Sequence, residues 1–162
     1  MFQIFKKKEN AKIVIASPVK GTAVGLDKVN DPTFSECMLG KGVAIIPKEG
    51  KIYAPADGEI GLMFDTLHAV SMTTKEGVEL LIHVGLDTVK LKGEGFTGHV
   101  ATGDEVKKGD LLLTVDLEAV KAAGYETITP IVVCNTDDYE AVEASNLSEV
   151  EQGDEVISIT IK

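Results

Sequence analysis

Two of the three histidines in the chain lie in a stretch whose residue pattern predicts a β-hairpin. His68 belongs to the apolar and β-branched run 62–73, and His83 belongs to the similar run 78–84. The polar segment 74–77 between the runs ends in a glycine, which can take a positive φ angle and close a tight turn. The two histidines are therefore predicted on neighbouring antiparallel strands.

The register of this hairpin decides whether the two imidazole rings can meet. A four-residue loop pairs Thr73 with Val78 and, further along the ladder, His68 with His83. Directly opposite residues have Cβ atoms roughly 4.5–5.5 Å apart, and period-two alternation places Thr66 on the same face as His68. A loop one residue longer or shorter would move one ring to the far face. Because neutral imidazole is a nucleophile that a second imidazole can orient, the sequence predicts a two-histidine site.

The remainder of the chain has the spacing of an all-β protein. From Ile13 onward, short apolar segments are broken by Gly, Pro, Asp and Asn about every 8–12 residues. A proline stands three residues before a glycine at both 18–21 and 55–58, and Gly-Asp-Glu-Val occurs at both 103–106 and 153–156. These repeats favour an antiparallel β-sandwich or barrel of internally duplicated type, with a few short helical turns.

Three segments are candidates for the short helical turns. Residues 31–40 form one turn or an irregular excursion, residues 117–124 form a helix ending at a glycine, and 137–144 form a third opened by an aspartate cap. We expect residues 1–12 to be a flexible leader and 13–162 to be one domain. A basic amphipathic segment touching anionic lipid is the alternative for the leader.

Composition narrows the function classes and the compartment. The 162 residues carry a formal net charge of −10 with a pI near 4.7, which argues against a nucleic-acid ligand and favours basic partners. Cys37 and Cys134 are widely spaced, no signal peptide is visible, and no apolar run approaches the ~20 residues of a membrane span. We therefore expect a cytoplasmic protein with free thiols, and we expect Cys134 to lie in the core.

With these residues set out, the chain resembles the glucose-family enzyme IIA of the bacterial phosphoenolpyruvate-dependent sugar phosphotransferase system. The resemblance covers about residues 15–162, and its most specific part is the block around His83. The matching segments are Gly42–Ile45, Ala54–Gly58, Thr66–Val70, Val78–Val89, Leu91–Phe96 and Thr129–Val133.

The resemblance implies a duplicated β-sandwich (a duplicated hybrid motif) and a phosphohistidine mechanism. By position, His83 matches the residue that accepts a phosphoryl group from the phosphocarrier HPr and passes it to a cysteine of enzyme IIB. His68 matches its partner ring, and Thr66 matches the residue that orients that ring. No cofactor is expected, although a partner carboxylate could complete a zinc site on His68 and His83.

The resemblance also implies a docking surface around the two histidines. Asp31 and Asp87 match acidic residues beside the site, where they would face a basic partner. The matching apolar docking positions, of which Met38, Leu39 and Val84 differ in detail from other members, are Phe34, Met38, Leu39, Phe64 and Val84.

Several alternatives stay open at this stage. A zinc-dependent hydrolase could use His68 and His83, although the sequence has no HxH or HExxH motif. A biotinyl or lipoyl carrier shares the turn patterns but needs a modified lysine, and Lys75 lacks the usual context. A regulator whose phosphorylation state selects transporters or enzymes is compatible with the carrier role. We expect a free-standing monomer, and the sequence leaves the sugar open.

Overall fold

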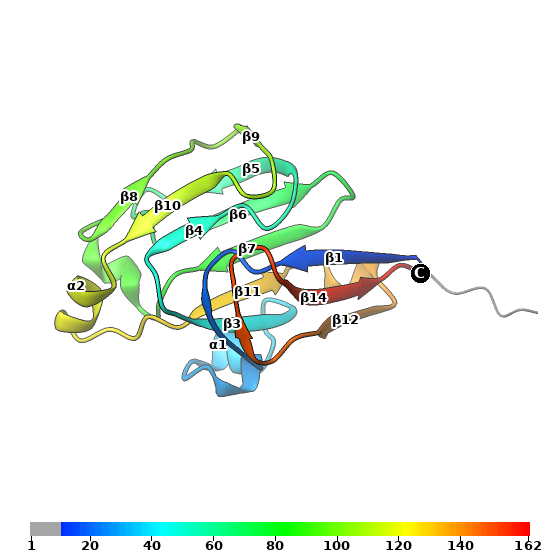
Figure 1. Ribbon diagram of the computed structural model, residues 1–162, viewed down its shortest axis with the longest axis horizontal. Coiled ribbons are helices and arrows are strands. Elements are labelled where there is room, and N and C mark those ends of the chain that lie inside the picture. The colour runs from blue at the N-terminus through cyan, green and yellow to red at the C-terminus, as the bar shows by residue number, and fades with distance from the viewer. Residues whose placement is uncertain (1–10) are drawn as a thin grey trace, which may run out of the picture.

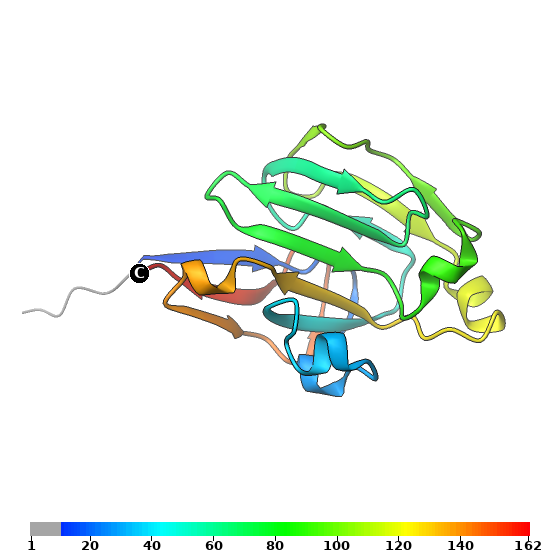
Figure 2. The same cartoon turned by 180° about the vertical axis from the view of Figure 1, so that it is seen from behind.

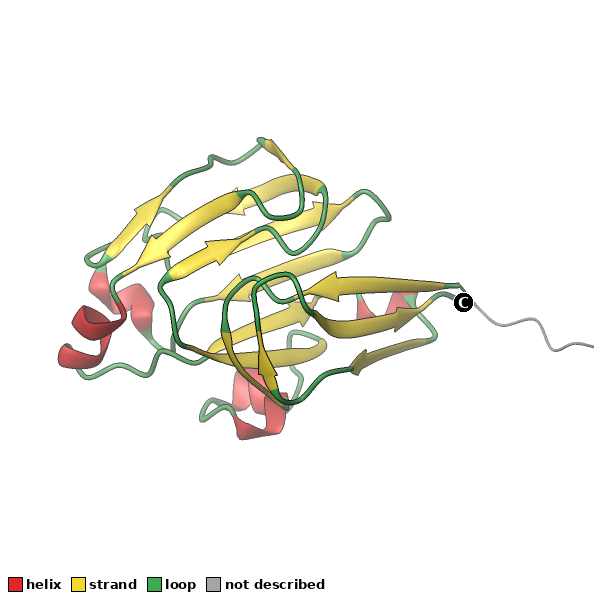
Figure 3. Cartoon of the chain, in the orientation of Figure 1, coloured by secondary structure: helices red, strands yellow, loops and turns green. Residues whose placement is uncertain are grey.

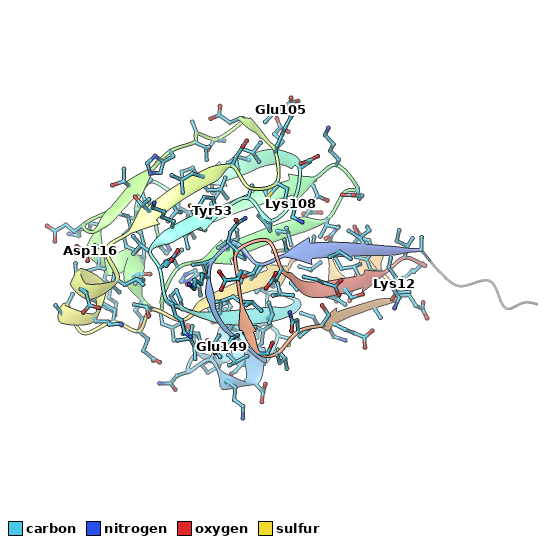
Figure 4. All side chains as sticks on the ribbon, viewed as in Figure 1. Lys12, Tyr53, Glu105, Lys108, Asp116 and Glu149 are labelled. Carbon is cyan, nitrogen blue, oxygen red and sulfur yellow. The ribbon has the colours of Figure 1, made fainter. Side chains whose placement is uncertain are left out.

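The computed structural model describes residues 11–162 and shows antiparallel β-sheets with short helical turns (Figure 1). The predicted leader 1–12 falls almost entirely outside the described residues. Its last residue, Lys12, labelled in Figure 4, begins a strand and pairs with Thr160. Among residues 11–162, no helix has the length and apolar character needed to cross a bilayer.

The largest sheet has eight strands, and it carries the two histidines. Every pairing recorded within it is antiparallel, which agrees with the predicted fold class. In spatial order its strands are β13 (Glu149–Val150), β2 (Gly21–Val24), β3 (Lys41–Pro47), β11 (Thr129–Val133), β7 (Glu79–His83), β6 (Ala69–Thr74), β5 (Gly58–Met63) and β9 (Glu105–Val106).

Two three-stranded sheets complete the β-structure, and Figure 3 shows how strands dominate the chain. One sheet has the order β1 (Lys12–Ala16), β14 (Glu155–Thr160) and β12 (Ala141–Ala144). The other has the order β4 (Lys51–Tyr53), β10 (Leu111–Val115) and β8 (Phe96–Gly98). The helical turns are η2 (Leu26–Lys28), α1 (Pro32–Ser35), η3 (Thr88–Leu91), α2 (Leu117–Ala122) and η4 (Thr136–Asp138).

The recurring turns of the sequence do open strands as predicted. Gly21 begins β2 and Gly58 begins β5, and a Cβ at either position would lie about 2 Å from a carbonyl oxygen of the neighbouring strand. Asp104 and Asp154 each accept a hydrogen bond from the backbone N–H three residues earlier, at 2.8 Å. The same local chemistry therefore builds the same turn twice.

Strand β11 is buried along its whole length because it separates two hydrophobic clusters. Ile131 and Val133 point into the main core between the sheets. Val132, on the opposite face, joins a smaller cluster with Phe34 of α1 and Leu86. Figure 2 shows α1 and the neighbouring η2 against this second face. The large sheet thus has an inner side toward the main core and an outer side covered in part by α1.

Two sequence-based expectations about the other segments are confirmed and two are wrong. Helix α1 starts after Asp31, whose side chain accepts from the Thr33 N–H at 3.0 Å, and α2 ends before Gly124, which has φ +93°. The helix expected over 137–144 is absent: one 3-10 turn is followed by β12, which alternates a buried Val142 with an exposed neighbour against β14. Cys134, expected in the core, is exposed because it follows the last residue of β11.

Candidate active site

His83 is the last residue of β7, and its ring lies on the outer side of the large sheet. The ring is partly buried, and its centroid lies 5.1 Å from that of Phe34. Its chain neighbours Ile82 and Val84 point the other way, into the main core. Strand alternation therefore directs the His83 ring toward the surface beside α1.

One ring nitrogen of His83 has a fixed role. Nδ1 lies 2.7 Å from the carbonyl oxygen of Gly85. A carbonyl oxygen can only accept a hydrogen bond, so Nδ1 must carry the proton and donate it. In the neutral ring Nε2 then has a free lone pair. This is the nitrogen that can attack an electrophile.

The predicted register of the hairpin is wrong by one residue. Ala69, rather than His68, is paired with His83, because the Thr74 N–H bonds to the Val78 carbonyl and closes a three-residue loop. Gly77 ends that loop with φ +93°, as the sequence predicted. Such three-residue loops commonly place a glycine in the left-handed region at this position.

The two rings nevertheless meet, because His68 lies outside the strand. The predicted strand 62–73 is in fact the end of β5, the loop 64–68 and β6, so Thr66 and His68 belong to a loop. Leu67 has φ +58°, which turns the chain just before His68. Strand alternation does not govern a residue in this bend.

The imidazoles of His68 and His83 pack edge to face. Their centroids are 5.0 Å apart and their planes are inclined at 83°. Thr66 Oγ1 lies 2.6 Å from His68 Nδ1, and the ring of Phe64 lies 5.5 Å from that of His68. The structure therefore brings together His68, His83 and Thr66, as predicted.

Both rings favour the neutral form. Burial lowers the pKa of His68 to about 4, and the neighbouring His83 adds to the lowering. Burial also lowers the pKa of His83, against the opposing effects of the Gly85 hydrogen bond and of the Asp31 and Asp87 charges. At neutral pH the pair is therefore uncharged, and the His83 lone pair is free to react.

The predicted docking residues divide into exposed and buried groups. Met38 and Leu39 are 70% and 42% exposed, and Phe64 is partly exposed. Phe34 and Val84 are 3% and 1% exposed, so they support the site from below instead of offering a contact surface. Phe34 packs in the smaller cluster with Val132 and Leu86, and Val84 faces the main core, so neither residue lies on the docking surface as the sequence predicted.

The two acidic residues predicted beside the site flank a shallow pocket. Asp31 and Asp87 line a space of about 370 Å³ together with Glu126. The negative charges of Asp31 and Asp87 both raise the pKa of His83. Asp87 is exposed, whereas Asp31 is partly buried by its role as the cap of α1. His99, the third histidine, is exposed and bonds to Thr114 at 3.3 Å. It does not belong to this site.

Sequence reasoning missed the backbone that orients His83. The Gly85 carbonyl bonds to the ring, and segment 126–128, from elsewhere in the chain, holds the Gly85 turn. A glycine two residues after a strand histidine was visible in the sequence, but the direction of its carbonyl depends on contacts about 40 residues away. Within residues 11–162, no group of three His, Cys, Asp or Glu side chains is placed to hold a metal ion.

Residues 13–139 match the protein family described as phosphoenolpyruvate-dependent sugar phosphotransferase system, EIIA 1. The chain belongs to this family. It is a glucose-family EIIA phosphoryl carrier, and the family transfers its phosphoryl group through a histidine. EIIA carriers work between the phosphotransferase-system partners HPr and EIIB.

Similar proteins include both EIIA components and longer EIIBCA components. The glucose-specific EIIA component of Oceanobacillus iheyensis is 41% identical over 97% of the chain and 94% of that protein. The beta-glucoside-specific EIIBCA component of Bacillus subtilis is 43% identical over 94% of the chain, which spans only 25% of that protein. The solved structure of glucose permease IIA from Mycoplasma capricolum is 42% identical, with a TM-score of 0.86 over 92% of this chain and 96% of that one.

Proposed function

We propose that Nε2 of His83 is the atom that carries the phosphoryl group in this EIIA. It would take the group from a histidine of HPr and pass it to a cysteine of EIIB. The observation that carries the proposal is the 2.7 Å bond from His83 Nδ1 to the Gly85 carbonyl, which leaves Nε2 bare. In the first step the P–N bond to HPr breaks as the P–Nε2 bond forms, and the electron pair returns to the HPr ring.

His68 and Thr66 would stabilise the transferred group. If the Thr66 hydroxyl donates to Nδ1 of His68, then Nε2 of His68 carries the proton and can donate to a phosphoryl oxygen. Phosphoryl transfer depends on positioning and on stabilising charge over these oxygens. A neutral His68, buried at 5% exposure, would supply that donor without any proton transfer.

The surface around the rings suits a partner with a mixed apolar and basic face. Met38 and Leu39 would contact apolar side chains, and Asp31 and Asp87 would attract basic ones. The net charge of −10 would increase the rate of encounter with such a partner. Phosphorylation would add roughly two negative charges here, so it could also change which transporters or enzymes bind.

Other properties follow from the same proposal. We propose that the chain acts in the cytoplasm as a monomer and needs no cofactor, and that its sugar belongs to the glucose family, which the EIIBC partner would select. Relatives named for glucose and for beta-glucosides are similarly identical to the chain, so they do not separate these sugars. Zinc binding on His68 and His83 would need a carboxylate from a partner protein.

The test is phosphorylation of the purified protein with phosphoenolpyruvate, enzyme I and HPr, followed by intact-mass measurement. We expect one phosphoryl group on the wild type and none on His83→Gln. His68→Gln should accept the group but fail to transfer it to EIIB. His99→Gln removes an exposed histidine and should behave like the wild type.

Two outcomes would contradict the proposal. A phosphoryl group on His83→Gln would show that another residue is the nucleophile. A wild-type protein that gains no phosphoryl group, but binds zinc stoichiometrically and cleaves a substrate, would favour the hydrolase.

A further inference from the structure

The turn after β7 determines where the Gly85 carbonyl points, and therefore which nitrogen of His83 is protonated. Gly85 has φ +80°, and its carbonyl reaches back to the ring only two residues earlier. Rotation of this peptide plane would remove the acceptor from Nδ1. Two consecutive peptide groups, Val84–Gly85 and Gly85–Leu86, must therefore keep their orientation if Nδ1 of His83 is to keep its acceptor.

Backbone contacts from the segment before β11 hold one side of this turn. The Gly85 N–H donates to the Ile128 carbonyl and the Leu86 N–H donates to the Glu126 carbonyl, both at 3.1 Å. These bonds fix the N–H side of each peptide group. The carbonyl of the second group accepts from His83 itself. The carbonyl of the first, Val84, still needs a partner because Val84 is buried.

Thr88 supplies that partner. Its hydroxyl donates to the Val84 carbonyl at 2.5 Å, and the side chain is fully buried, at 0% exposure. Its methyl group lies beneath Gly85, where an added Cβ would be only 2.6 Å from Thr88 Cγ2. The Val84 N–H meanwhile donates to the His68 carbonyl at 2.7 Å. One residue, Val84, thus connects the backbone of both histidines, and Thr88 holds its carbonyl.

We propose that Thr88 is a positioning residue for the phosphoryl-transfer reaction, acting through Val84 and Gly85 to keep His83 protonated at Nδ1 and bare at Nε2. This inference rests on the proposed role of His83. Without the Thr88 hydroxyl, the Val84 carbonyl is left buried and unpaired, so the turn gains by rotating to find another donor. The Gly85 carbonyl then leaves His83 Nδ1, and the tautomer protonated at Nε2 becomes populated. In that tautomer Nε2 has no free lone pair with which to attack phosphorus.

Two substitutions separate the hydroxyl of Thr88 from its methyl group. Thr88→Val keeps the shape and removes the hydrogen bond, whereas Thr88→Ser keeps the hydroxyl and removes the methyl group. A role in packing alone predicts that Ser is the more harmful change. A role in positioning predicts that Val is. Thr74→Val is the matched control, because Thr74 is also buried and its hydroxyl bonds to backbone, but at the far end of β7.

The first measurement is the imidazole ¹⁵N NMR spectrum of the unphosphorylated full chain at pH 8, where protonated and bare ring nitrogens are distinguished by chemical shift. We expect His83 to be protonated at Nδ1 in the wild type, Thr88→Ser and Thr74→Val, and to be a tautomer mixture in Thr88→Val. This readout requires no partner protein, so it stands even if the proposed phosphotransfer fails.

The second measurement is the rate of phosphorylation by phospho-HPr at a temperature where circular dichroism shows each variant folded. We expect Thr88→Val to be about fivefold slower, the factor for one net hydrogen bond of about 1 kcal/mol, and Thr88→Ser to stay near the wild-type rate. Wild-type tautomer and rate in Thr88→Val would overturn the proposal. If Thr88→Val does not fold, Thr88→Ser decides: a wild-type spectrum supports the role of the hydroxyl, and a shifted tautomer overturns it.

Discussion

Acidification should destabilise the folded protein through His68. In the unfolded chain this histidine has an ordinary pKa near 6.5, whereas burial and the neighbouring His83 lower its pKa to about 4 in the folded state. Between these values the unfolded state binds a proton that the folded state does not. The stabilising contribution is therefore intact above about pH 6.5, and it is lost progressively as the pH falls toward 4.

The size of the effect follows from the two pKa values. Each pH unit between them changes the free energy of unfolding by about 1.4 kcal/mol. Integrated from pH 7 to pH 5, the loss for His68 alone is about 2 kcal/mol. The lowered pKa of His83 acts in the same direction. Most carboxylates are still ionised at pH 5, so this interval isolates the histidines.

Urea unfolding at pH 7 and pH 5 measures this loss. The wild type should lose about 2 kcal/mol more than His68→Gln over the interval, and an NMR titration should show that the His68 ring stays neutral at pH 5. His99→Gln is the control, because that ring is exposed in both states. Equal losses in the wild type and His68→Gln, or a His68 ring that titrates near 6.5, would refute the reasoning.

Two further predictions concern the turn beside His83 and the neighbouring strand β11. Gly85→Ala should strongly reduce the rate of phosphorylation by phospho-HPr, because the added Cβ would lie 2.6 Å from Thr88 and the φ angle is positive. Gly77→Ala is the control, because Gly77 also has a positive φ angle but has open space around it. It should cost only about 1 kcal/mol of stability and leave the phosphorylation rate unchanged. Ile131→Ala should lower the free energy of unfolding by about 2–5 kcal/mol in a urea titration, whereas Ile161→Ala, 36% exposed, should cost far less. A phosphorylation rate unchanged by Gly85→Ala, or equal costs for the two isoleucines, would contradict these expectations.

The sequence identified the histidine pair but not the reason why the rings meet. Alternation along two strands predicted that His68 faces His83. The structure instead pairs His83 with Ala69 and turns the His68 ring toward His83 through a bend at Leu67. The register error comes from a loop that closes with three residues instead of four. The bend has no local sequence signal either, because a positive φ angle is uncommon at a leucine. The rings still meet because His68 lies in a loop, where the two-residue alternation of a strand does not fix the direction of its side chain.

Tertiary context also overrode the local pattern elsewhere. The segment 137–144 has an aspartate where a helix cap is expected, yet pairing with β14 makes its second half a strand. By contrast, Gly77 and Gly124 act as predicted, because the positive φ angle of a glycine in a turn depends on its immediate neighbours. The carbonyls of Glu126 and Ile128 that hold the Gly85 turn belong to distant backbone, which a single sequence does not display.

The turn that orients the His83 ring has a consequence for the order of folding. His68 and His83 are only 15 residues apart on one hairpin, a local element of the kind that forms within microseconds. The carbonyls of Glu126 and Ile128 that fix Gly85 belong to a segment about 40 residues further along, and closing such a long loop comes later. During synthesis the chain therefore acquires its two rings side by side first. It becomes a competent phosphoryl acceptor only when the segment leading into β11 docks, so a truncated or half-folded chain should not draw phosphoryl groups from the pathway.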